Sequence, residues 1–423
     1  MRRPYPLLYA LCVALVFLHA ELQPSVSVAV GGSDATLYLS DAAVLTAGVV
    51  GLLAGRELGF APLRHARAIW LSSALFLGVV LAGTLLGPSL TDGYPFFENL
   101  LTAAKFAEYA LLAVAAPLVL RTARDLEPLL VTLTLWSCAA TVGAVLQFLG
   151  VVDEFEGRRP GQREPSFLGI HDLAALSGTT LALGLLAIAL GHRRRLGAVA
   201  GVAGALGVIL SGATAAVAGI VAAGAAAWAL GRRRALALAA IVAVVAAGVV
   251  AIRTVEMGPV LDALGIDHPR DVATDPEASW EQRLALGYIG GRMFLDHPLT
   301  GVGWQGSSEE PSYAPHLDDA RARFPDLPER ALPSPEHAWG VQNGYLQAAA
   351  DMGVLGLAAF LAFLLVPLRA AWGAGAAGAV PILWLLVAMG VWIGLGLVAG
   401  IPLVGLTWLG IGLSAAAASW TET

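Results

Sequence analysis

One polar segment in this mostly apolar chain holds residue types that could move a proton or hold a polar substrate. Glu336-His337 is followed by Gln342-Asn343, and Asp351 stands in the apolar run behind them. Histidine titrates near neutral pH and is the usual general base. A single loop histidine is more often only solvated, so His337 is a candidate that depends on its neighbours in the fold.

Arginines outside the apolar runs are the candidates for binding phosphate, because guanidinium offers a planar fork of donors that matches phosphate oxygens. Arg283 lies on a helix-like stretch at about 280–294, and Arg159 and Arg163 fall in a short connection between two apolar runs. The alternative for each arginine is an ordinary ion pair with a neighbouring acidic residue.

Further ionisable residues lie inside or close to the apolar runs, where they are costly unless they are used or paired. His171-Asp172 could be an acid/base pair beside a basic pocket or part of a charge-balanced turn. Lys105 and Glu108 are three residues apart on a helix and can neutralise each other. The alternative for this second pair is a proton or ion relay.

Metal and cofactor sites are not indicated. Residues 297–306 have GxGxxG spacing, but a dinucleotide site needs a preceding strand and a helix that opens at the third glycine. We interpret these glycines as a turn that ends the 280–294 helix. Cys12 and Cys138 lie in apolar runs and the histidines lack metal-ligand spacing, so we expect no metal and no cofactor.

The composition decides which elements must position these residues. The chain is 57% hydrophobic and 13% charged, and its mean hydropathy is +0.73. Its apolar runs are long enough to cross about 30 Å of hydrocarbon as helices. The fold class that we predict is an all-α polytopic membrane protein with about 12 transmembrane helices. The expected spans are 5–22, 37–54, 68–87, 99–120, 128–150, 166–190, 196–211, 214–230, 235–252, 347–368, 380–398 and 402–419.

Arginine placement predicts the orientation. The basic residues gather in alternate connections, at 2–3, 56–67, 121–124, 193–195, 232–234 and 369. The positive-inside rule makes these connections cytoplasmic, together with both termini. We therefore expect a multi-pass protein of the cytoplasmic (inner) membrane, with an uncleaved first helix.

One long connection breaks the pattern of short loops. Residues 253–346 carry more Asp and Glu than Arg and lie before the tenth predicted span. A loop of this length is too long to be a mere link. We predict a membrane domain at 1–252 with nine spans, an extracytoplasmic cap at 253–346 and a membrane domain at 347–423 with three spans. The acidic balance also excludes a nucleic-acid partner.

Taken in order, these motifs resemble the O-antigen ligase and O-antigen polymerase family of bacterial membrane enzymes. That family carries a histidine-asparagine pair, nine residues and then GxxG where the chain returns to the membrane. Asn343, Gly353 and Gly356 reproduce this spacing. Residues 297–306 resemble the family's glycine motif, and Arg283 occupies the place of the arginine ahead of it. Residues 159–174 look like the earlier short-loop motif.

Two positions depart from the family pattern. Gln342 stands where the family has histidine, and a carboxamide cannot take a proton. The serine-arginine pair usual between the seventh and eighth spans reads Ser211-Gly212-Ala213-Thr214. Either His337 and another arginine replace these groups, or this is a divergent member with altered or lost activity.

The resemblance implies glycosyl transfer from a polyprenyl-diphosphate carrier to an acceptor hydroxyl on a glycan, lipid or protein. Arg283 with Arg159 or Arg163 would bind the diphosphate, in a region that also holds His171. Gln342 and Asn343 would orient the donor or the acceptor. His337, or otherwise Asp351, would act as the base, and membrane lipid would surround the spans.

Two other classes stay open at this stage. A multi-span transporter or permease could use Lys105, Glu108 and His171, although we find no paired half-repeats with broken helices. A catalytically inactive family member that binds lipid-linked glycan is the third possibility, because of Gln342. Release of the diphosphate lipid would separate an enzyme from the other two.

Overall fold

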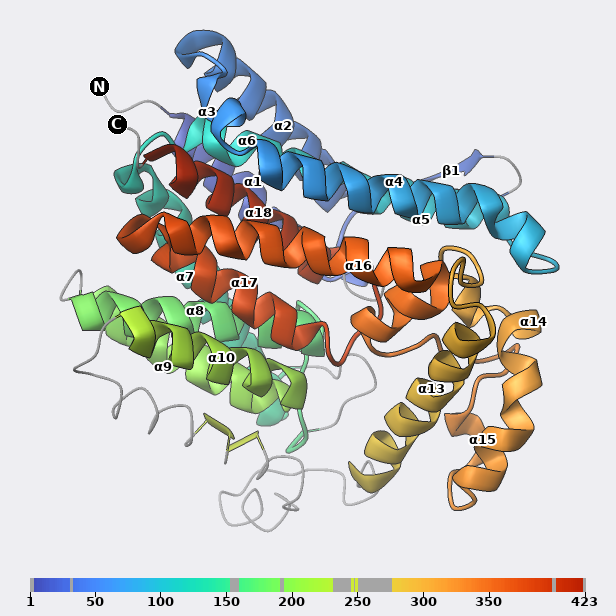
Figure 1. Cartoon of the computed structure of the whole chain (residues 1–423). Coiled ribbons are helices and arrows are strands. Elements are labelled where there is room, and N and C mark those ends of the chain that lie inside the picture. The colour runs from blue at the N-terminus through green and yellow to red at the C-terminus, as the bar shows by residue number, and fades with distance from the viewer. Residues whose placement is uncertain are drawn as a thin grey trace.

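The computed structural model describes residues 4–30, 33–152, 160–190, 194–230, 245–246, 248–249, 276–397 and 401–420. Helices dominate these residues and form one bundle with a smaller helical unit at its end (Figure 1). The bundle helices are α1 (Tyr5–Val16), α2 (Leu39–Leu58), α3 (Ala61–His65), α4 (Arg67–Leu90), α5 (Phe96–Glu108), α6 (Ala110–Val119), α7 (Leu126–Phe148), α8 (Ile170–Leu190), α9 (Arg194–Ser211), α10 (Thr214–Leu230), α16 (Gly344–Gly373), α17 (Ala379–Val391) and α18 (Ile401–Trp420).

The prediction of a helical polytopic membrane protein is confirmed in its general form. Within the described residues, eight helical segments are long and apolar enough to cross a membrane, and three shorter apolar helices accompany them. The ninth predicted span, 235–252, lies almost entirely outside the described residues. The total of about 12 spans therefore stays a prediction.

A β-hairpin interrupts the all-helical pattern, which the sequence analysis did not anticipate. Strands β1 (Ser25–Val30) and β2 (Ser33–Tyr38) pair antiparallel, with Val26 opposite Leu37. The run Ser-Val-Ser-Val-Ala-Val has the two-residue alternation and β-branched content of a strand. Its position between two long apolar helices concealed this short signal.

An aromatic cluster in the bundle fixes α16 against its neighbours. Phe363 of α16 lies with its ring centroid 4.8 Å from that of Trp408 and 5.0 Å from that of Phe76, on α18 and α4. Trp408 also donates a hydrogen bond to the Phe106 carbonyl near the end of α5. Aromatic pairs of this kind stabilise a helix interface beyond the area that they bury. These contacts fix the middle of α16 against α4 and α18.

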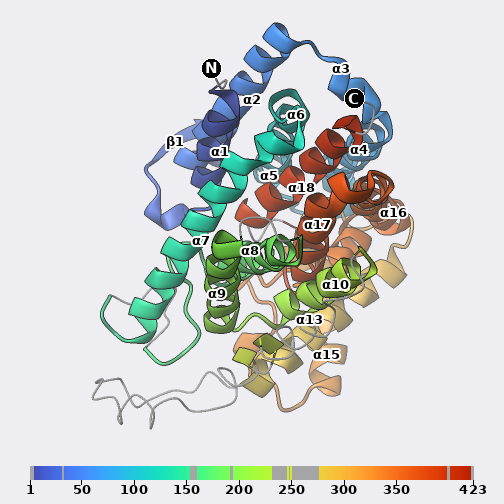
Figure 2. The same ribbon diagram turned by 90° about the vertical axis from the view of Figure 1, so that its left-hand side faces the viewer.

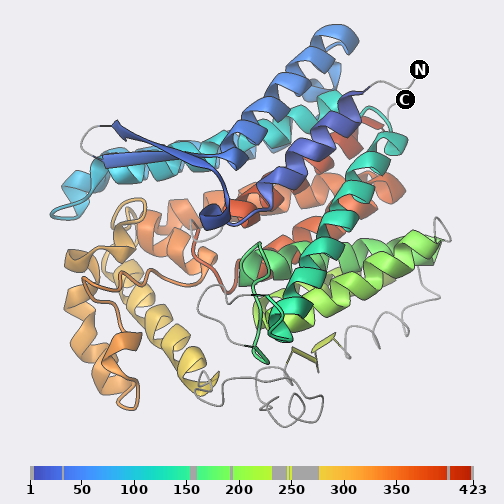
Figure 3. The same ribbon diagram turned by 180° about the vertical axis from the view of Figure 1, so that it is seen from behind.

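Residues 276–343 form a cap at one end of the bundle. The cap contains α13 (Pro276–Asp296), α14 (Glu310–Tyr313) and α15 (Leu317–Arg323) around a hydrophobic cluster of its own, and α13 packs against α16. The helix expected at 280–294 is therefore present as α13. The chain termini lie at the opposite end of the bundle (Figures 1 and 3), where α1 and α18 are neighbours (Figure 2).

Lys105 makes an ion pair with a different acid from the one the sequence suggested. Its Nζ lies 3.0 Å from Oδ2 of Asp41, whose side chain is 3% exposed, and it donates a hydrogen bond to the Thr36 carbonyl. The ammonium also lies over the Tyr38 ring. Helical spacing pointed to Glu108, but α2 and the hairpin bring Asp41 and Thr36 to the same side chain.

Replacing Lys105 should therefore destabilise the fold. Lys105→Met leaves the Asp41 carboxylate buried without its cation, and breaking a buried pair in this way costs about 3–5 kcal/mol. Thermal unfolding in lipid nanodiscs measures the loss. The double variant Asp41→Leu/Lys105→Met should recover much of it, whereas Arg321→Met, at an exposed pair with Asp318, should change stability by less than about 1 kcal/mol. Equal losses in Lys105→Met and Arg321→Met would contradict the structural role.

Candidate functional site

The site lies where the cap meets the first turn of α16. Asn343 is the N-cap of this helix, and its Oδ1 accepts hydrogen bonds from the backbone N–H groups of Tyr345 and Leu346, at 3.1 and 3.0 Å. Its Nδ2 donates to the carbonyl of Ile393 at 3.1 Å. An N-cap satisfies backbone donors that a helix start would otherwise leave open. Asn343 thus fixes the direction in which α16 leaves the cap.

Two of the predicted binding residues meet directly before this N-cap. The Nε of Arg283 on α13 donates to Oε1 of Gln342 at 3.5 Å, the long end of the hydrogen-bond range. Both side chains are half-buried. The contact joins residues that are 59 positions apart in the chain. The arginine and the amide therefore share one place where the cap meets the start of α16.

Asp351, about two turns into α16, accepts several hydrogen bonds in the protein interior. Its side chain is completely buried. One carboxylate oxygen accepts from the backbone N–H of Gln305 at 3.0 Å and from Nε2 of Gln347 at 3.0 Å, and the other accepts from the N–H of Ser307 at 3.1 Å. The backbone of Gln305 is held at φ 62°, in the left-handed region. Asp351 therefore anchors the glycine-rich cap segment to α16.

The two glycine motifs of the sequence bind one another. The N–H groups of Val302 and Gly303 donate to the carbonyls of Ala350 and Asp351, at 3.0 and 2.8 Å. The N–H of Val354 donates to the carbonyl of Pro298 at 2.8 Å. These bonds replace helical ones at a break in α16, where Gly353 has φ 67°. The 297–307 segment thus holds α16 in a broken conformation close to the site.

His337 lies in an exposed turn of the cap, five residues before Gln342. Its backbone exchanges two hydrogen bonds with Ser334, and its ring stacks on Trp339 with centroids 6.0 Å apart. Trp339 in turn donates to the Arg330 carbonyl. The turn therefore presents the imidazole to solvent from a defined position.

The remaining predicted residues come from other elements. Arg159 lies outside the described residues. Arg163 is half-buried in the connection between α7 and α8, and His171 is half-buried in the first turn of α8. The contact between Arg283 and Gln342 joins other parts of the chain, namely α13 and the segment directly before α16. Arg163 and His171 are thus neighbours of each other in sequence but not members of that contact.

Among the titratable groups of the cap, Glu309 and His316 have shifted pKa values. Burial raises the pKa of Glu309, and the nearby carboxylate of Glu98 acts in the same direction. Burial lowers the pKa of His316, although Asp296, with Oδ2 3.8 Å from its Nε2, opposes the shift. Both residues are more easily kept neutral than in water, which fits a packed cap.

Sequence reasoning missed the partners of Asp351. Gln305, Ser307 and Gln347 were not assigned roles, yet they supply its three hydrogen-bond donors. A signal was present, because an aspartate in an apolar run requires donors to offset its burial. Which donors these are depends on how the cap folds back on α16.

The described residues form a bundle of membrane-length helices, with a helical cap bound to a broken helix. This is the architecture of a multi-pass membrane protein with its polar site at one end of the bundle. Residues 199–361 match the family model described as O-antigen ligase, so the resemblance to the O-antigen ligase and polymerase family is confirmed. The match spans less than half of the chain. It includes Arg283, the 297–307 segment and Asn343, and excludes Arg163 and His171. The comparison with curated proteins found no match.

The break in α16 yields a direct test. A Cβ at Gly353 would lie 2.4 Å from the Leu299 carbonyl oxygen, and its φ of 67° disfavours any side chain. Gly353→Ala should lower the free energy of unfolding by at least about 1–3 kcal/mol, measured by thermal unfolding in nanodiscs. Gly291→Ala is the matched control, because a Cβ there meets nothing within 4 Å. Equal stability of the two variants would refute the packing described for the 297–307 segment.

Proposed function

We propose that this protein transfers a glycan from a polyprenyl-diphosphate carrier to an acceptor hydroxyl at the outer face of the cytoplasmic membrane. The observation that carries the proposal is the contact between Arg283 and Gln342, at the position that resembles the histidine-asparagine pair of the O-antigen ligase family. The family match supports an O-antigen ligase-like or polymerase-like function in general. The donor, the acceptor and the side of the membrane belong to our proposal.

The reaction sets clear demands on charge. The acceptor oxygen forms a bond to the anomeric carbon, and the bond from that carbon to the diphosphate oxygen breaks. The electron pair of the broken bond leaves with the lipid diphosphate, and the hydroxyl proton passes to a base. In this proposal Arg283 stabilises the negative charge that grows on the leaving group, with Arg159 or Arg163 as the second cation.

Gln342 cannot accept a proton as the family's histidine could, but its amide can form hydrogen bonds. Its carbonyl oxygen accepts from Arg283, so the amide orients the guanidinium, and its NH₂ group can donate to a phosphate or sugar oxygen. Asn343 contributes by fixing the start of α16. In this proposal His337 is the base, because it is exposed on the same stretch of the cap.

Asp351 takes a positioning role in the proposal. A carboxylate that is fully buried and accepts three hydrogen bonds has no open approach for an acceptor hydroxyl. Its effect on transfer would come through the 297–307 segment and the break in α16. His171 remains a candidate for binding the substrate near Arg163.

The orientation rests on arginine placement and on the shape of the chain. The cap and the chain termini lie at opposite ends of the bundle (Figure 1). With the arginine-rich connections in the cytoplasm, the termini face the cytoplasm and the cap faces outward. Membrane lipid surrounds the bundle, and a lipid-linked donor can reach the site from within the bilayer.

Loss of Arg283 tests the proposal most directly. Arg283→Ala in purified protein with a lipid-linked glycan donor should slow transfer by about 100-fold, the usual effect of removing one donor to a developing anion. Arg321→Ala, on the exposed surface of α15, should leave transfer unchanged. Release of polyprenyl diphosphate is the measurement. Unchanged release in Arg283→Ala would remove this residue from the proposed site, and no release by the native protein would favour an inactive, glycan-binding member of the family.

The base assignment predicts opposite effects at two neighbouring positions. His337→Ala should lower kcat by about 100-fold or more, because a general base typically contributes that much, and it should flatten the pH profile of kcat. Gln342→His restores the family's residue beside Arg283 and should raise kcat. Full transfer by His337→Ala would show that this histidine is not the base.

A further inference from the structure

The membrane-spanning segment made of α5 and α6 is interrupted at Tyr109. Phe96–Val119 together are long and apolar enough to cross a membrane, yet α5 ends at Glu108 and α6 begins two residues later. The break lies beside the start of α2, because Lys105 of α5 pairs with Asp41 and α2 packs against α6 (Figure 2). The carbonyl end of a helix carries partial negative charge. The break therefore places the negative end of α5 inside the bundle, next to α2.

Four polar side chains at this break have an oxygen atom without a hydrogen-bond partner among the described residues. These atoms are Oγ of Ser40 and Oδ1 of Asp41 on α2, Oε1 of Glu108 at the end of α5, and the hydroxyl of Tyr109. Ser40 and Tyr109 are 0% and 1% exposed. The Tyr109 hydroxyl lies near Ser40 and within electrostatic range of both carboxylates. The four oxygen atoms thus gather in one buried place.

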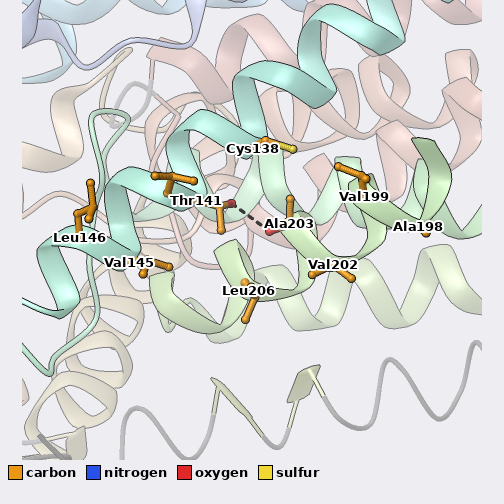
Figure 4. Close-up of a pocket in the computed structure, with 10 residues that line it drawn as sticks. Cys138, Thr141, Val145, Leu146, Ala198, Val199, Val202, Ala203 and Leu206 are labelled. Carbon is orange, nitrogen blue, oxygen red and sulfur yellow. Dashed lines mark hydrogen bonds between the residues drawn. The ribbon is translucent and has the colours of Figure 1, made fainter. Parts of the chain in front are cut away.

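Several other buried hydroxyls of the bundle are satisfied by a nearby carbonyl. Those of Thr84, Thr407 and Ser414 donate to the carbonyl one turn earlier in their own helices. In the apolar groove between α7 and α9, the hydroxyl of Thr141 donates to the Ala203 carbonyl at 3.0 Å (Figure 4). Burying a polar group without a partner is costly. Four such atoms in one place therefore point to a ligand that contacts them together.

The charges at the break favour a monovalent cation. Asp41 and Glu108 supply two carboxylates, whereas Lys105 supplies one ammonium, 3.0 Å from Oδ2 of Asp41. Buried charges are paired or coordinate metals, so one further positive charge completes the balance. In the part of the chain that the structure describes, no three acidic, histidine or cysteine side chains form a metal cluster, which argues against a divalent ion. A proton on Glu108 would supply the charge, but it could not contact all four oxygen atoms.

We propose that Ser40, Asp41, Glu108 and Tyr109 bind one Na⁺ ion at the break between α5 and α6. Oxygen ligands suit hard cations, and the carbonyl ends of interrupted membrane helices can coordinate Na⁺. Acidic residues inside a membrane protein mark ion sites in the same way. The expectation of no metal rested on cysteine and histidine ligands, which Na⁺ does not need. The site uses none of the residues of the proposed transfer reaction and does not depend on it.

Thermal unfolding of the full-length protein in nanodiscs tests the ion. At constant pH and ionic strength, Na⁺ in place of N-methylglucamine should raise the Tm by about 2 °C or more, because a ligand that binds only the folded state stabilises it. Binding of radioactive Na⁺ to the folded protein should saturate at one ion per chain. Equal Tm values in the two salts, with no saturable binding, would mean that a proton or water satisfies these oxygen atoms, and would overturn the proposal.

Variants assign the ion to this cluster. Ser40→Ala and Tyr109→Phe each remove one oxygen atom and should raise the Kd for Na⁺ about tenfold or more, because a contact with a charged group is worth that much. Ser137→Ala is the matched control and should leave the Kd unchanged. Ser137 lies on α7, is 0% exposed, and has a hydroxyl that also lacks a partner among the residues described. The same Kd in all three variants would place the ion elsewhere and contradict the assignment.

Discussion

The structure depends on one buried carboxylate at a break in a membrane helix. Asp351 is removed from water, and a buried charge is costly unless hydrogen-bond donors surround it. Two of its donors are backbone N–H groups of Gln305 and Ser307, which reach it only when the 297–307 segment lies on α16. The fold of the cap and the break at Gly353 therefore stabilise each other.

That mutual dependence explains why the polar site lies at the boundary of the bundle. Irregular backbone at membrane depth is tolerated only where protein buries it or water reaches it. Here the 297–307 segment buries the break, and Asn343 satisfies the first backbone donors of α16. The aromatic packing of Phe363, Trp408 and Phe76 holds the helix from the other side. The start of α16 is thus fixed by Asn343 beside a half-buried arginine, and its later part is fixed by the aromatic packing.

Much of the architecture could be predicted because long apolar runs and arginine-rich connections are local signals. Helices α2, α4, α7 and α16 follow from these signals. The end of α13 was predicted from the glycines that follow it at 301, 303 and 306. The hairpin at 25–38 was missed because its alternation is short. The partner of Lys105 was missed because Asp41 lies 64 positions away on another helix, where no spacing rule applies.

The sequence by itself determined that this is a helical membrane protein, and it named Arg283, Gln342 and Asn343 as residues of one motif set. Hydrophobic length suffices for the first conclusion, and the resemblance to the O-antigen ligase and polymerase family supplied the second. Only the tertiary structure decided that Arg283 contacts Gln342, that Asn343 caps α16 and that Asp351 binds the glycine segment. A hydrogen bond depends on a distance in space, and the bonds of Arg283 and Asp351 join residues 59 and 46 positions apart.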